Sequence, residues 1–180
     1  MQRYGGPVFG RCRGVTLYEL LLAVAIAAVL AALAVPSFGS FRRAAGVSTA
    51  TTELLGALHF ARSAAVLNGL PVTLCLTADA ATCLASEARA ATGWLVFTQP
   101  EATVFSVAIG DQPVLRSFRL PPDVSVHASR AAVTFWPVTR ASTTSTFDIC
   151  DVTRTVRGRA VVVSQTGRPR VAPEEATCTQ

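Results

Sequence analysis

The stretch that decides the fold is GVTLYELLLAVAIAAVLAALAVP, residues 14–36. From Leu20 to Val35 it has sixteen apolar residues without a charge, and counted from Val15 the segment is 21 residues long. As a helix it would be roughly 31 Å long, which is enough to cross the hydrocarbon core of a bilayer. Three basic residues precede it and favour a cytoplasmic N-terminus. They are Arg3, Arg11 and Arg13.

Glu19 is the residue of this stretch that does not suit a membrane segment. An ionised side chain costs about 3 kcal/mol at the bilayer centre and less near an end. A secretory signal cleaved after residues 32–34 (ALA) would not need the carboxylate, and neither would a plain membrane anchor. A type IV prepilin signal cleaved after Gly14 would need it.

The segment resembles the class III signal of type IV pilins and type II secretion pseudopilins. In that family a prepilin peptidase cuts after the glycine and methylates the new N-terminus. Val15 would be the first mature residue here, which makes Glu19 the fifth and Pro36 the twenty-second, as in the family. Val15 departs from the Phe or Met that is commoner there. The resemblance implies that Glu19 pairs with the α-amino group of Val15, in its own or a neighbouring subunit, and serves filament assembly.

Four segments follow from these observations. Residues 1–14 are the leader, 15–38 a transmembrane and filament-core helix, 39–69 its amphipathic second half, and 70–180 a β-rich head. Pro36 is expected to kink the helix. Apolar residues then recur at three- and four-residue spacing, as in an amphipathic helix. They are Val47, Ala50, Leu54, Leu58, Ala61 and Ala65. Asn68, Gly69 and Pro71 are expected to end this helix.

The head is predicted to be antiparallel and β-rich. β-Prone runs separated by turns occur at 72–76, 93–98, 103–109, 114–119, 124–127, 133–136, 146–150 and 160–164. A hairpin turn is expected at 110–113 (GDQP). One long N-terminal helix packed on such strands is an α+β fold, and with the signal it is a type IV pilin-like fold.

The chain has five cysteines, and Cys12 lies in the leader that cleavage would remove. The four that remain are Cys75, Cys83, Cys150 and Cys178. An even number fits disulfides in an oxidising compartment such as the periplasm, and three pairings are open. In one of them Cys75–Cys83 would tie the first strand to its loop. Cys150–Cys178 would then close a loop of about 29 residues and pin the C-terminal tail.

No pattern for catalysis or for metal or cofactor binding is present. The sequence has no Walker A, G-x-S-x-G, H-E-x-x-H or C-x-x-C motif, and its only histidines are His59 and His127. We therefore expect a protein that is not an enzyme and holds no metal or cofactor. Asp148 and Asp151 flank Cys150 and are expected to meet nearby arginines.

Positive charge gathers near the C-terminus. The formal net charge is +5, all sixteen basic residues are Arg, and residues 152–171 contain five Arg and no acid. Arg154, Arg157 and Arg159 precede a predicted strand and residues 167–170 (GRPR) follow it, so the strand could present both groups at one edge. Gly167 allows an unusual backbone angle, and Pro169 should make Arg168 and Arg170 project apart from a stiff loop. A merely solvated charged loop is the alternative.

Later stretches resemble the FimT/GspH group of minor pilins and pseudopilins. They are 54–75 (LLGALHFARSAAVLNGLPVTLC), 93–97 (GWLVF) and the closing pattern ICD…R…VVVSQTGRPR. In FimT-type members that support natural transformation, a C-terminal G-R-x-R motif binds DNA, and residues 167–170 match it. The resemblance implies non-specific binding of extracellular double-stranded DNA through Gly167, Arg168 and Arg170. Its phosphate backbone would be the contact, with Arg154, Arg157 and Arg159 as auxiliaries.

The resemblance also implies partners and a location. The precursor would be a single-pass protein of the bacterial inner membrane, processed by the prepilin peptidase. Assembly with other major and minor pilin subunits would place the head in the periplasm or on an extracellular pilus. The alternative is a structural subunit, like the minor pilin FimU or the pseudopilin GspH. It would initiate or cap a type IV pilus or a type II secretion pseudopilus without binding DNA.

Overall fold

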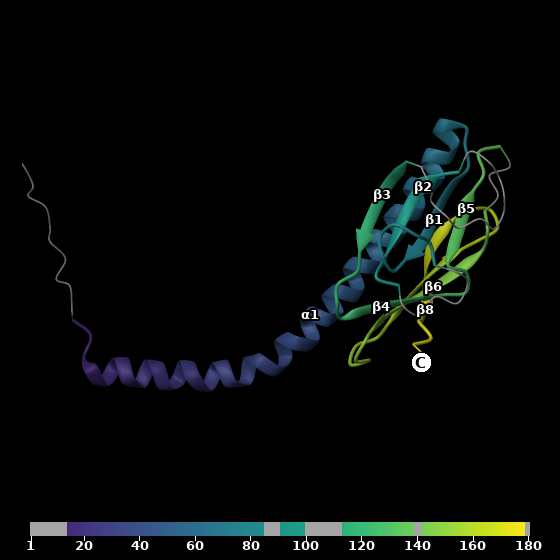
Figure 1. The fold of residues 1–180 in the computed structure, drawn as a ribbon. Helices are drawn as coiled ribbons and strands as arrows, with labels where there is room; N and C mark the ends of the chain where they lie inside the picture. The colour runs from purple at the N-terminus through teal and green to yellow at the C-terminus, as the bar shows by residue number, and fades with distance from the viewer. Residues whose placement is uncertain (1–13, 85–90, 100–112, 139–141, 179–180) are drawn as a thin grey trace, which may run out of the picture. The chain divides into compact units, whose positions relative to one another are not determined.

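The computed structural model describes residues 14–84, 91–99, 113–138 and 142–178 (Figure 1). The helix α1, Leu17–Asn68, comes first in these ranges, and the strands follow it. They are β1 (Val72–Thr77), β2 (Gly93–Thr98), β3 (Val114–Arg119), β4 (Val124–Ala128), β5 (Ala132–Phe135), β6 (Ser145–Asp151), β7 (Arg159–Val163) and β8 (Pro169–Glu175). The chain divides into two compact units, Met1–Gly39 and Ser40–Gln180, so α1 begins in the first and ends in the second.

In the first unit, Thr16 and Glu19 cap the start of α1. The Thr16 N–H donates to Glu19 Oε2 at 3.0 Å, and the Glu19 N–H donates to Thr16 Oγ1 at 3.3 Å. This reciprocal pair is a capping box, which satisfies two backbone donors that the first helical turn leaves unpaired. Glu19 therefore has a local structural role that the sequence prediction did not foresee.

Large apolar side chains of the first unit are exposed along α1, among them Leu17, Val24 and Leu30. Contiguous exposed apolar surface of this kind marks an interaction site in many proteins. Among the described residues, the structure has no helix whose length and apolar character would suffice to span a bilayer.

In the second unit, α1 buries one stripe of side chains. All six residues predicted to form the apolar face are buried, from Val47 to Ala65. The helix ends at Asn68, and Gly69 follows with a φ of 66°, the left-handed cap that the sequence predicted. The amphipathic half of the helix is therefore confirmed.

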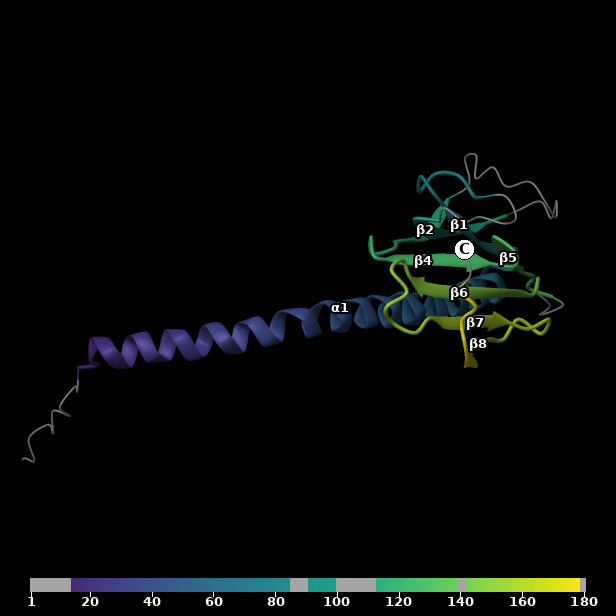
Figure 2. The same ribbon diagram turned by 90° about the horizontal axis from the view of Figure 1, so that it is seen from below.

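The strands form two antiparallel sheets, and the fold is α+β as predicted. The order is β3-β2-β1-β5 in the first sheet and β4-β6-β7-β8 in the second, and Figure 2 shows the second sheet strand by strand. The core lies where the buried stripe of α1 meets both sheets. Its largest fully buried side chains include Trp94, Phe135 and Phe147.

The structure pairs the cysteines in the arrangement considered above. Cys75 is bonded to Cys83, and Cys150 is bonded to Cys178. Cys75 lies with Leu95 and Phe97 in a small second cluster, against which Cys83 packs. The first disulfide thus holds the loop after β1 over the second apolar face of the first sheet.

Two strand predictions need comment. No strand was predicted after residues 160–164, and Arg168 and Arg170 were expected on a stiff loop, but residues 169–175 form the strand β8. The predicted strand 103–109 and turn 110–113 lie outside the described residues. The other seven predicted strands each fall on a strand of the structure to within about one residue at either end.

Candidate nucleic-acid interface

The GRPR motif begins in a tight hairpin between β7 and β8. The Gly167 N–H donates to the Ser164 carbonyl oxygen at 2.9 Å, and the Ser164 N–H donates to the Arg168 carbonyl oxygen at 3.3 Å. Gly167 has a φ of 69°, which glycine adopts without steric cost. A three-residue loop whose last residue is left-handed is a common way to join antiparallel strands. The prediction that Gly167 takes an unusual backbone angle is confirmed.

The two arginines of the motif lie on one side of the chain. Pro169 between them is buried, whereas Arg168 and Arg170 are exposed. Because side chains alternate along an extended chain, both arginines lie opposite Pro169, with Cα atoms about 6.6 Å apart. Pro169 pairs with the core residue Val163, and Arg170 pairs with Val162. The prediction that they project apart is wrong, because both lie on the side opposite the buried Pro169, Arg168 at the end of the hairpin and Arg170 in β8.

β8 is an edge strand of the second sheet. Proline is tolerated in such a strand because its missing N–H need not join a ladder of hydrogen bonds. Within the described ranges, neither the Arg168 nor the Arg170 guanidinium donates a hydrogen bond or forms an ion pair. Both groups are therefore open to an anion from solvent.

The other predicted arginines lie at the far end of β7. Arg159 begins that strand, so a strand length of about 16 Å separates it from the hairpin. It pairs with the core residue Ile149, which places its side chain on the opposite face from Arg170. Arg154 lies in the preceding turn, with a φ of 55°. The structure does not bring the two arginine groups together, and the prediction of a shared edge is wrong.

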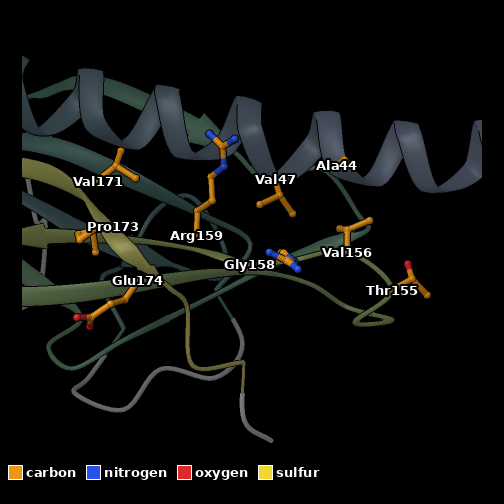
Figure 3. A pocket seen from close by; sticks show the side chains of 11 residues that line it. Ala44, Val47, Thr155, Val156, Gly158, Arg159, Val171, Pro173 and Glu174 are labelled. Carbon is orange, nitrogen blue, oxygen red and sulfur yellow. The ribbon is translucent and has the colours of Figure 1, made fainter.

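Arg157 and Arg159 instead line a separate hollow of about 670 Å³. Ala44 and Val47 of α1 and residues 171–174 of β8 complete its wall. In Figure 3, Arg159 points toward α1, whereas Glu174 points away from it. Two arginines and one glutamate thus line the hollow, and neither Arg168 nor Arg170 belongs to its lining.

The turn that holds Arg154 is organised by Asp151, which the sequence interpretation paired with arginines. Its Oδ2 accepts hydrogen bonds from the Thr153 hydroxyl at 2.7 Å and from the Thr155 N–H and hydroxyl at 2.9 and 2.8 Å. Burial raises the pKa of Asp151, but these donors outweigh it and lower the pKa to about 2. Its Oδ1 is buried without a partner in the described part of the chain. Threonines, and not arginines, thus hold this carboxylate.

Asp148 was also predicted to meet nearby arginines, and the structure gives it other neighbours. It lies on the outer face of the second sheet, in register with His127 of β4. Burial raises the pKa of Asp148, against the opposing effects of a backbone hydrogen bond from Thr177 and the charge of His127. Asp148 therefore helps to hold the C-terminal tail that Cys178 anchors.

Arg62 is a residue of the site that the sequence interpretation missed. It lies on α1, is half-buried, and its Nη1 donates to the Gly167 carbonyl oxygen at 3.0 Å. The two residues are 105 positions apart. A single arginine on a helix carries no local signal of such a contact, so only the tertiary structure reveals it.

No metal site accompanies these residues. In the part of the chain that the structure describes, no group of three or more His, Cys, Asp or Glu side chains is placed to hold a metal ion. The exposed chemistry of the site is that of guanidinium groups, which recognise phosphates and carboxylates.

Solved structures of minor pilins and pseudopilins share this arrangement of a helix followed by two antiparallel sheets. Two crystal structures of the type IV minor pilin FimU of Pseudomonas aeruginosa (strain PAO1) are similar. One has 22% identity and a TM-score of 0.53 and covers 72% of this chain and 97% of that one. The other has 21% identity and a TM-score of 0.56, with coverages of 76% and 97%.

The minor pseudopilin EpsH from the type 2 secretion system of Vibrio cholerae has the same fold. It is 10% identical, with a TM-score of 0.51, and covers 74% of this chain and 98% of that one. No curated protein sequence matches the chain. Residues 50–167 match the family model of the type II transport protein GspH, which is well over half of the chain. The chain therefore belongs to the GspH family.

Proposed function

We propose that this GspH-family minor pilin binds extracellular double-stranded DNA without sequence preference, for DNA uptake in natural transformation. The observation that carries the proposal is the pair Arg168 and Arg170, exposed on one side of the chain where the hairpin enters the edge strand β8, with no partner for either guanidinium among the described residues. The resemblance of residues 167–170 to the DNA-binding motif of FimT-type proteins supports the same conclusion.

The geometry suits a phosphate backbone better than base edges. Guanidinium groups form charge-assisted, often bidentate hydrogen bonds with phosphate oxygens. Two arginines with Cα atoms about 6.6 Å apart at the start of an edge strand could each hold one phosphate of the same DNA strand. Contacts to phosphates position DNA but carry no sequence information. Because Arg154, Arg157 and Arg159 lie at the other end of β7, we expect them to contribute less than the motif itself.

Processing and assembly form the second part of the proposal. Cleavage between Gly14 and Val15 would leave the Thr16–Glu19 capping box intact in the mature chain, with the new α-amino group one residue from Thr16. Glu19 would then have a charged partner beside it or in the next subunit, as the prepilin resemblance implies. Inner-membrane insertion of residues 15–38 before assembly is proposed from the apolar sequence alone. Mass spectrometry of the mature protein should find Val15, and not Val35, as its first residue.

DNA binding can be measured on the full chain in a nonionic detergent. A labelled random-sequence duplex is titrated at several salt concentrations, and the dissociation constant is read by fluorescence anisotropy. With two to four phosphate contacts, the slope of log affinity against log salt should be about −2 to −4. Arg168→Ala/Arg170→Ala should remove most of the binding and about 2 from the magnitude of that slope.

The matched control is Arg116→Ala/Arg119→Ala. It removes the same charge from exposed positions on β3, an edge strand of the other sheet. An equal loss of affinity in this control would show that binding follows net charge and not the motif. No binding by the unaltered chain at low salt would leave the structural alternative, a filament subunit like the similar FimU or EpsH.

A further inference from the structure

The hairpin that carries the motif is fastened to the rest of the molecule from two sides. Ser142 donates from its N–H to the Gln165 carbonyl oxygen at 3.1 Å and from its hydroxyl to the Ser164 carbonyl oxygen at 2.9 Å. On the other side, Arg62 of α1 donates to the Gly167 carbonyl oxygen at 3.0 Å. Among the described residues, the other hydrogen bonds of residues 164–168 outside the β7–β8 ladder are local to the hairpin.

Arg62 is well placed to act as a rigid support. Its neighbours Ala61, Ala64 and Ala65 are buried in the main core, so the helical turn that carries it is fixed against the sheets. The arginine itself is half-buried, and a hydrogen bond from a charged donor in a partly dry setting is stronger than one between neutral groups.

The hydrogen bond from Arg62 to the Gly167 carbonyl oxygen lies where it can set the direction of the motif. Gly167 is the left-handed residue of the hairpin, and the next residue is Arg168. Glycine restricts its own backbone angles less than any other residue, so the peptide after Gly167 would have the most freedom in the loop. Holding the Gly167 carbonyl oxygen orients that peptide, and with it the start of β8.

We infer that Arg62 is a positioning residue for the DNA interface. It fixes the Gly167 carbonyl group and so holds Arg168 beside Arg170 in the arrangement that two successive phosphates require. The inference rests on the proposed function. It adds a residue from α1, 105 positions away, to a site otherwise confined to the C-terminal hairpin.

The test uses Arg62→Gln, Arg62→Lys and the unaltered full chain in the DNA titration described above. Arg62→Gln removes the charged donor, and we expect about three- to ten-fold weaker DNA binding, because Arg168 must then be ordered when DNA binds. The salt slope should stay the same, since Arg62 touches no phosphate itself. Arg62→Lys retains a charged donor on a long side chain and should recover most of the affinity.

A double-mutant cycle that combines Arg62→Gln with the motif variant Arg168→Ala/Arg170→Ala separates a positioning role from a general loss of charge. In the Arg168→Ala/Arg170→Ala background, adding Arg62→Gln should cause no further loss, because the group that it positions is gone. Arg119→Gln removes one charge elsewhere and should change the affinity less than two-fold. Hydrogen exchange at the Gly167 and Arg168 amides should quicken in Arg62→Gln by more than the loss of global stability accounts for.

The possible failures are distinguishable. If Arg168→Ala/Arg170→Ala abolishes binding and Arg62→Gln binds as the unaltered chain does, the inference is overturned and the proposed function stands. A reduced salt slope in Arg62→Gln would make Arg62 a direct phosphate contact and would also overturn it. If the motif variant binds as well as the unaltered chain, the proposed function fails and the inference falls with it.

Discussion

Replacement of Asp151 by Asn should destabilise the second unit in a way that depends on pH. Asp151 is 1% exposed, and its Oδ2 accepts three hydrogen bonds, from Thr153 and Thr155. Burial alone raises the pKa of Asp151, but the donors of the two threonines prevail and lower it from 3.8 to about 2. The folded protein therefore favours the ionised form.

The magnitude and sign follow from that difference in pKa. The difference between a pKa of 3.8 and one of about 2 corresponds to about 2 kcal/mol of the free energy of unfolding. Because the pKa of Asp151 is lower in the folded than in the unfolded state, this contribution is complete well above pH 3.8. It is lost as the pH falls from 3.8 to about 2. Asp151→Asn lacks the ionised form at every pH, so its deficit should be about 2 kcal/mol at pH 7 and should shrink in acid.

Urea denaturation at pH 7, 4 and 2.5 measures this deficit, with fluorescence of the buried Trp94 as the signal. Asp123→Asn is the control, because Asp123 forms an exposed ion pair with Arg42 at 3.0 Å, and such pairs contribute at most about 1 kcal/mol. A deficit of Asp151→Asn that stays the same from pH 7 to pH 2.5 would refute the assignment of stability to the ionised carboxylate.

Three glycines give further predictions, each checked by urea denaturation. Gly158→Ala would place a methyl group 2.5 Å from the Cys178 Sγ atom, so we expect a loss of about 1–3 kcal/mol and faster reduction of the tail disulfide by dithiothreitol. Gly167→Ala must adopt a φ near 69° and should lose about 1–2 kcal/mol, with weaker DNA binding; unchanged stability would contradict the hairpin geometry. Gly56→Ala meets nothing within 4 Å on an exposed part of α1, so a gain of about 0.5–1 kcal/mol is expected, and a loss would count against the packing of α1.

The elements that the sequence predicted well are those with a periodic local pattern. The apolar stripe of α1 repeats every three or four residues because one face of the helix must be buried. Short β-prone runs bounded by turn residues likewise located β1 and β2 almost to the residue. In both cases the pattern lies in residues that are close together in the sequence, so it can be recognised without the tertiary structure.

Sheet order was not predictable in this way. β5 pairs with β1 in the first sheet, and β4 pairs with β6 in the second, although β4 and β5 are consecutive in the chain. Nothing in either short strand indicates which partner it takes, because the choice depends on how the whole set of strands covers α1. The contact between Arg62 and Gly167 depends on the same choice, since it requires the β7–β8 hairpin to lie against the helix.

The error about the directions of Arg168 and Arg170 arose because Pro169 was interpreted as a loop residue. In a loop, the directions of Arg168 and Arg170 are unspecified, and a stiff turn between them suggests that they diverge. An edge strand accepts the same proline without losing a hydrogen bond of the sheet. Because side chains alternate between the two faces of a strand, a buried residue fixes the face on which its neighbours lie. Since Pro169 faces the core beside Val163, both arginines must face solvent on the same side. The burial of one proline therefore places both arginines on one side of the chain, and the proposed binding of two successive phosphates requires this arrangement.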